Sequence, residues 1–144
     1  LDLGYKKEMC VVRLINQLAP QYEWLIKAKQ SVPNGKEDSN GIDISILTTH
    51  GKFYLQVKGT LNAAHKFTRR DSHGRHFKKI SIISSPNMED EENGSFCMFS
   101  PNPDALPFII VLVIYNNGRG KIEDEEKVLQ KIKIALGLIK LRFV

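Results

Sequence analysis

The sequence is poor in cysteine and in long apolar runs, and each shortage excludes a class of protein. Its 144 residues include only two cysteines, Cys10 and Cys97, too few for the disulfide framework of a small secreted domain. Both have apolar neighbours, so we expect buried thiols in a reducing cytoplasm. The longest apolar run, residues 108–115, is far shorter than the roughly 20 residues that span a bilayer. No secretory or transit segment is recognisable, and we expect a cytoplasmic protein without a membrane anchor.

The remaining composition is typical of one globular domain. A chain of 144 residues can bury one hydrophobic core but is short for two ordinary domains. Hydrophobic residues make up 42% and charged residues 26%, which excludes collagen-like and wholly disordered proteins. We therefore expect a single domain over residues 1–144.

Positive charge is concentrated in one window, residues 65–79. This window holds six of the 21 Lys and Arg residues and one of the 16 acidic residues, so it carries the whole net charge of +5. A neutral body with one cationic segment predicts an anionic partner that binds at a defined place. We expect the six basic side chains to contact the phosphate backbone of DNA: Lys66, Arg69, Arg70, Arg75, Lys78 and Lys79. The alternative is a mobile, solvated loop.

Hydrophobic periodicity and turn residues predict an α/β domain with a helix, several strands and a second helix. The helices are expected over residues 5–19 and 122–141. Residues 61–68 fit either a short helix or a mobile loop. Residues 84–106 are assigned as a variable connector, within which residues 95–99 could form a strand. The other strands are expected over residues 22–29, 42–47, 52–58, 79–83 and 107–115.

The strands at residues 42–47 and 52–58 form a predicted hairpin that gathers polar side chains among apolar ones. Alternation places Asp43, Gln56 and Lys58 on one side of this hairpin. A four-residue loop puts Asp43 opposite Gln56, whereas a two-residue turn puts it opposite Lys58. Either register brings a carboxylate, an amide and an ammonium together. The simpler alternative is a solvated cross-strand ion pair between Asp43 and Lys58, with Gln56 as a neutral neighbour.

Glu8 lies at the centre of the apolar stripe expected on the first helix. A charge buried at such a place is costly unless it is paired or binds a cation. Glu8 could instead interact with the start of the helix and remain in water. The sequence leaves both alternatives open.

Gly-Ile-Asp-Ile at residues 41–44, followed by Gln56-Val57-Lys58, resembles the metal-binding hairpin of the PD-(D/E)xK nuclease superfamily. The pattern is most similar to the branch that uses Q-x-K, as in Mrr-like restriction endonucleases. A preceding helix with a glutamate, here Glu8, also resembles that superfamily. The resemblance covers residues 5–59. It implies a restriction endonuclease-like α/β fold with a mixed sheet of four or five strands flanked by helices.

The resemblance also implies Mg²⁺- or Mn²⁺-dependent hydrolysis of phosphodiester bonds in DNA. Asp43 would then be the central metal ligand, and the Gln56 side chain and the Val57 carbonyl would be further ligands. Glu8 would be a ligand or hold a water, while Lys58 would orient the attacking water and stabilise developing charge. Mg²⁺ prefers oxygen ligands of this kind. A domain this small would normally need a second copy, as a homodimer, to cut both strands.

Two other functions remain open from the sequence. Gln56 is uncharged where many superfamily members have Glu or Asp, so the alternative is a nuclease fold that binds DNA with weak catalysis or none. A protein-interaction module with a basic loop is a third hypothesis. A zinc site at His73 and His76 is not supported, because no nearby cysteine pair completes four ligands.

Overall fold

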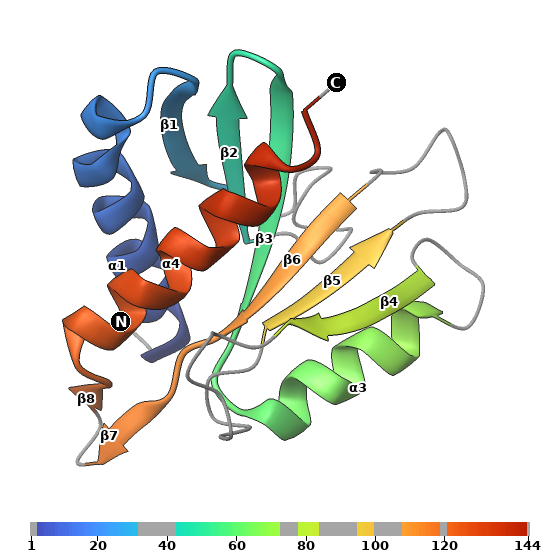
Figure 1. Cartoon of the computed structure of the whole chain (residues 1–144). Helices are drawn as coiled ribbons and strands as arrows, with labels where there is room; N and C mark the ends of the chain where they lie inside the picture. Colours follow the sequence, from blue (N-terminus) through green and yellow to red (C-terminus); the bar gives the residue numbers. More distant parts are fainter. Residues whose placement is uncertain are drawn as a thin grey trace.

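A six-stranded mixed β-sheet with helices on both faces forms the domain (Figure 1). The computed structural model describes residues 3–31, 43–72, 78–83, 95–99, 108–118 and 121–143. The strand order is β1-β2-β3-β6-β5-β4. Neighbours pair antiparallel, except that β3 and β6 are parallel. A small antiparallel ribbon of β7 and β8 follows β6.

The helices and strands agree closely with the expected elements. The expected α/β class is confirmed, and the sheet has six strands instead of four or five, because residues 95–99 pair between β6 and β4. The rest of the segment 84–106 lies outside the described residues. The elements are α1 (Leu3–Leu18), the 3-10 helix η1 (Ala19–Gln21), β1 (Leu25–Gln30), β2 (Ile44–Thr48), β3 (Gly51–Lys58), α3 (Leu61–Ser72), β4 (Lys78–Ile83), β5 (Ser95–Phe99), β6 (Phe108–Val113), β7 (Asn116–Gly118), β8 (Lys121–Ile122) and α4 (Glu125–Lys140).

The sheet buries both of its faces, and each face has its own apolar core. Ile44, Leu55 and Leu112 point toward α1 and α4, which cover one face. Tyr54 and Val111 alternate with them and pack against Ala64 and Phe67 of α3 on the other face. The central strand β6 is therefore a continuous apolar run, as expected for a strand covered on both sides. No helix of the described segments is long and apolar enough to cross a membrane.

The buried face of α1 differs from the expected stripe at its N-terminal end. Tyr5 is 40% exposed, and Glu8 is only half-buried, so neither lies at the centre of this face. The buried side chains are Lys7, Val11, Leu14, Ile15 and Leu18. The spacing 7, 11, 14 and 18 follows the helical repeat, as expected for an amphipathic helix. In its first turns the buried face contains Lys7 where Glu8 was expected. Tyr5 has an apolar ring, which predicts burial, but its side chain is exposed.

The β2–β3 hairpin has the register expected for the longer loop. Ile44 pairs with Leu55 and Ile46 with Phe53, and the turn closes at Thr48 and Gly51. Gly51 has a φ of 113°, a conformation that favours glycine. The Thr48 hydroxyl donates to the Gly51 carbonyl (2.8 Å) and accepts from the His50 amide (3.0 Å). This turn fixes which residues of the two strands face each other.

Candidate functional site

Asp43 lies just before β2, where the pairing between β2 and β3 ends. Its backbone N–H donates to the Leu55 carbonyl (3.1 Å), and its carbonyl accepts from the Ser31 N–H (2.9 Å). Its carboxylate Oδ2 accepts from the Val57 N–H (2.9 Å). The pairing of β2 with β3 ends at Ile44 and Leu55, so Asp43 lies just outside the paired residues and its placement opposite Gln56 stays a prediction. The carboxylate occupies the position of a main-chain acceptor beside Val57.

The bond between Asp43 and Val57 also orients the Val57 carbonyl. In an extended strand the N–H and C=O of one residue point to the same edge. Because the Val57 N–H faces Asp43, the Val57 carbonyl faces the same edge of β3. The Asp43 carboxylate and the Val57 carbonyl therefore lie on one edge of this strand, as a shared metal ion would require.

Gln56 is buried on β3, on the sheet face that α3 covers. Its exposed fraction is 5%, and its Oε1 atom has no hydrogen-bond partner among the residues that the structure describes. An unsatisfied buried polar group costs about 1–3 kcal/mol. A cation or a donor from a ligand would remove this cost. Asp43, Gln56 and the Val57 carbonyl together offer the hard oxygen atoms that Mg²⁺ prefers, so the donor set fits this metal.

Lys58 follows two residues after Gln56 and lies on the same face of β3. Its side chain is half-buried, and its Nζ lies 5.0 Å from the ring centroid of Phe67 on α3. This is within the range of a cation–π contact. The Asp43–Lys58 ion pair considered from the sequence is not among the ion pairs of the described residues. Lys58 is thus positioned by α3 and not by Asp43.

Glu8 is half-buried on α1, the helix on the opposite face from α3. The Glu8 side chain or backbone takes part in at least one hydrogen-bonding or electrostatic interaction. Within the described residues, no three or more His, Cys, Asp and Glu side chains gather as a metal-binding group. The expected metal ligands include only two such residues, Glu8 and Asp43, so this absence does not test them. Their role as metal ligands stays a prediction.

The basic window is built on regular structure in the part that the structure describes. Residues 65–72 continue α3, so the alternative of a mobile loop is wrong for them. Lys66 is exposed on α3, and Arg69 and Arg70 lie one turn further along this helix. Lys78 and Lys79 begin β4. Arg75, together with His73 and His76, lies outside the described residues.

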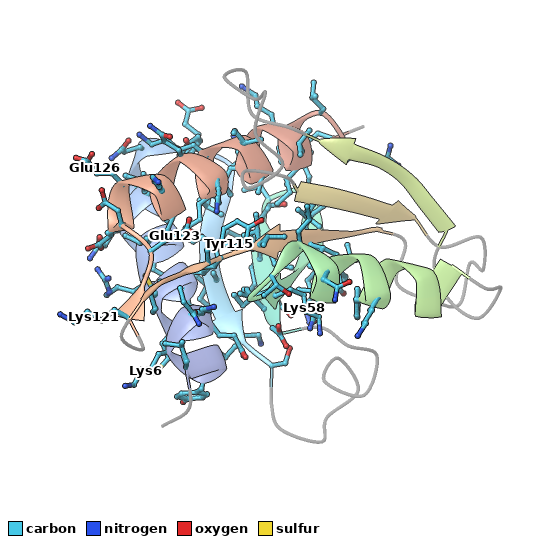
Figure 2. All side chains as sticks on the ribbon, turned by 90° about the horizontal axis from the view of Figure 1, so that it is seen from below. Lys6, Lys58, Tyr115, Lys121, Glu123 and Glu126 are labelled. Carbon is cyan, nitrogen blue, oxygen red and sulfur yellow. The ribbon has the colours of Figure 1, made fainter. Side chains whose placement is uncertain are left out.

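Residue patterns did not predict the buried ion pair that follows β6, where Figure 2 labels Glu123 and Tyr115. Lys131 of α4 donates from Nζ to Glu123 Oε1 (2.6 Å) and to the Val113 carbonyl (2.8 Å). Glu123 Oε2 accepts from the Tyr115 N–H (2.7 Å). Lys7 of α1 is a third buried charged residue. The helical repeat was the available signal, since Lys131 is three residues after Val128 and four before Ala135, both buried.

No protein-family model, curated protein or solved structure matches this chain.

Proposed function

We propose that this protein is a divalent-metal-dependent endonuclease that hydrolyses phosphodiester bonds in DNA. One observation carries the proposal: the Asp43 carboxylate accepts from the Val57 amide next to Gln56, whose buried Oε1 has no hydrogen-bond partner within the described segments. Such an arrangement is costly for an isolated chain and favourable around a cation. The order Asp43, Gln56, Lys58 also resembles the metal-binding hairpin of the PD-(D/E)xK superfamily.

Each residue of the site has a distinct role in this proposal. Asp43, Gln56 and the Val57 carbonyl would hold Mg²⁺ or Mn²⁺, with Glu8 as a further ligand or a holder of water. When bound, the ion supplies Lewis-acid polarisation of the phosphate and a more acidic water. Lys58 places an ammonium near the reacting phosphate, in a half-buried setting where a charge acts more strongly than in bulk water.

The test is cleavage of plasmid, linear duplex and single-stranded DNA in Mg²⁺, in Mn²⁺ and in EDTA. We expect cleavage with metal only. Lys58→Ala should lower the rate about a hundredfold, because it removes charge stabilisation at the transition state. Lys29→Ala, which removes an exposed lysine of β1, is the matched control and should cleave like wild type. Equal cleavage by Lys58→Ala and wild type would count against the proposed site.

A DNA-binding module without catalysis is the second candidate, favoured by the neutral Gln56 and by the charge outside the site. It predicts that binding depends on the basic window. Replacing Arg69, Arg70, Lys78 and Lys79 with glutamine should flatten the dependence of log K on log salt by about one unit per lost phosphate contact. Fluorescence anisotropy with a labelled duplex in EDTA measures this slope.

The matched control for the binding experiment removes four exposed lysines elsewhere: Lys121, Lys127, Lys133 and Lys140. This variant has the same net charge but keeps the basic window. We expect it to retain most of the salt slope. An equal loss of slope in both variants would show that binding follows net charge alone and does not use the window.

A further inference from the structure

Lys7 is a buried cation without an acid of its own. Its exposed fraction is 4%. The nearby Glu123 already has both oxygens engaged, one with Lys131 Nζ and the other with the Tyr115 N–H. In the part of the chain that the structure describes, Lys7 Nζ forms no hydrogen bond or ion pair. Two buried lysines therefore share one carboxylate.

The surroundings of Lys7 disfavour its charge. Burial is the main reason that its pKa lies below the usual value of 10.5, and the charge on Lys131 lowers this pKa further. Glu123 acts in the opposite direction but does not overcome the burial. The Lys7 side chain is largely buried, and its ammonium is not among the fully buried polar atoms of the described residues, so an anion from outside the chain can reach it and would be bound favourably.

The ammonium of Lys7 lies against the chain between β3 and α3. A Cβ atom added to Gly59 would lie 2.9 Å from Lys7 Nζ, so the end of the Lys7 side chain would have to move to make room for it. Gly59 directly follows Lys58, and α3 begins two residues later. Lys58 points to the α3 face, whereas Lys7 comes from α1 on the other face, so the two lysines lie on either side of the end of β3.

The N-terminus of α3 leaves main-chain donors at the same place. The Thr60 hydroxyl accepts from the Ala63 N–H (3.0 Å), and the Thr60 carbonyl accepts from the Ala64 N–H (3.1 Å). Among the described residues, no acceptor is seen for the N–H groups of Leu61 and Asn62. Free amides at a helix N-terminus favour anions, above all phosphate.

The topology places this feature where open α/β sheets bind ligands. The parallel strands β3 and β6 end side by side, and the Lys58 carbonyl accepts from the Ile114 N–H (2.8 Å). The chain leaves β3 for α3 on one face and leaves β6 for α4 on the other (Figure 1). Such a switch between neighbouring parallel strands creates a crevice at their carboxyl ends.

We propose that Lys7, Gly59 and the N-terminus of α3 form a binding site for a phosphate group. The assignment of this group to the DNA backbone, next to the phosphate at Lys58, rests on the proposed function. Lys7 would supply the charge, and the amides of Leu61 and Asn62 would supply hydrogen bonds.

The experiment titrates inorganic phosphate into ¹⁵N-labelled protein in EDTA, with sodium chloride keeping the ionic strength constant. We expect saturable shifts of the Gly59, Leu61 and Asn62 amide signals. Lys7→Met should weaken phosphate binding about tenfold, because it removes a charge-assisted hydrogen bond. Lys6→Met changes the exposed neighbouring lysine (Figure 2) and should bind like wild type. Gly59→Ala should weaken binding by displacing Lys7.

Lys7→Arg keeps the positive charge and guards against a folding defect in Lys7→Met. It should retain phosphate binding, and the melting temperature of Lys7→Met should be no lower than that of wild type. Absence of shifts at the three amides, or equal affinity in Lys7→Met and wild type, would overturn the site.

A DNA duplex titrated in EDTA then identifies the source of the phosphate. Weaker duplex binding by Lys7→Met supports a backbone phosphate. Unchanged duplex binding overturns that assignment and leaves a site for a free phosphate anion. No metal is present in either titration, so both titrations are independent of DNA cleavage. Failure to cleave DNA would refute the proposed nuclease activity but would not refute the phosphate site.

Discussion

Replacing Asp43 with asparagine is expected to lower the rate of DNA cleavage about a thousandfold, equivalent to roughly 4 kcal/mol of activation free energy. The asparagine oxygen can still accept from the Val57 N–H, so the hairpin geometry should survive. The substitution removes the negative charge that would attract the metal ion. Initial cleavage rates over a range of Mg²⁺ concentrations measure the effect, and thermal unfolding checks the fold.

The control for Asp43→Asn is Glu126→Gln, which neutralises an exposed acid in the first turn of α4. It should cleave at the wild-type rate. Asp43→Asn should keep its affinity for DNA in EDTA, because the predicted DNA contacts lie in the basic window. If Asp43→Asn cleaved as fast as wild type, the activity would belong to another site or to a contaminating nuclease, and the proposed function would be refuted.

Replacing Lys131 with methionine is expected to lower the free energy of unfolding by about 3–5 kcal/mol. Lys131 Nζ holds both Glu123 and the Val113 carbonyl, and all three lie at the end of the β3–β6 pair. Without the ammonium, the buried carboxylate of Glu123 loses its ion-pair partner. Urea unfolding, followed by tryptophan fluorescence from Trp24, measures the loss.

The matched control is Lys133→Met, which removes an exposed lysine from the same helix and should change stability by less than about 0.5 kcal/mol. The double variant Glu123→Leu, Lys131→Met removes both charges and should recover part of the loss. A single Lys131→Met variant as stable as wild type would show that the pair does not hold this end of the sheet.

The hairpin and its polar residues could be predicted from sequence because they depend on local alternation. Gln56 and Lys58 lie on β3 and Asp43 lies directly before β2, and the apolar residues Ile44 and Leu55 fix the register of the two strands. The exception is the backbone at Asp43. There the carboxylate accepts the hydrogen bond of the Val57 N–H in place of a main-chain carbonyl. The pattern of residue types does not predict this hydrogen bond.

The buried charges could not be predicted because residue type alone does not determine burial. Lys7 and Lys131 occupy core positions of their helices, whereas Tyr5 is largely exposed. A lysine can be buried when its ammonium reaches a partner, as Lys131 reaches Glu123. That partner comes from a different part of the chain, so the local sequence of α4 does not contain the information.

The pairing of β6 with β3 could not be predicted from local sequence patterns either. Its apolar run predicted a strand covered on both faces, which the structure confirms. Its neighbours depend on pairings between segments far apart in sequence, with β4 and β5 formed before the chain returns to β3. The parallel pairing of β3 with β6 follows from that return.

The edge strand β1 bears on how two copies of the chain could associate. Among the described residues β1 has no strand on its other side; Lys27 and Lys29 are exposed on it, and its pairing with β2 is irregular between Leu25 and Lys27. Charged side chains and bulges on an edge discourage strand-to-strand aggregation. Two copies joined through β1 would bring these lysines together, so the charges on β1 disfavour extension of the sheet through this edge.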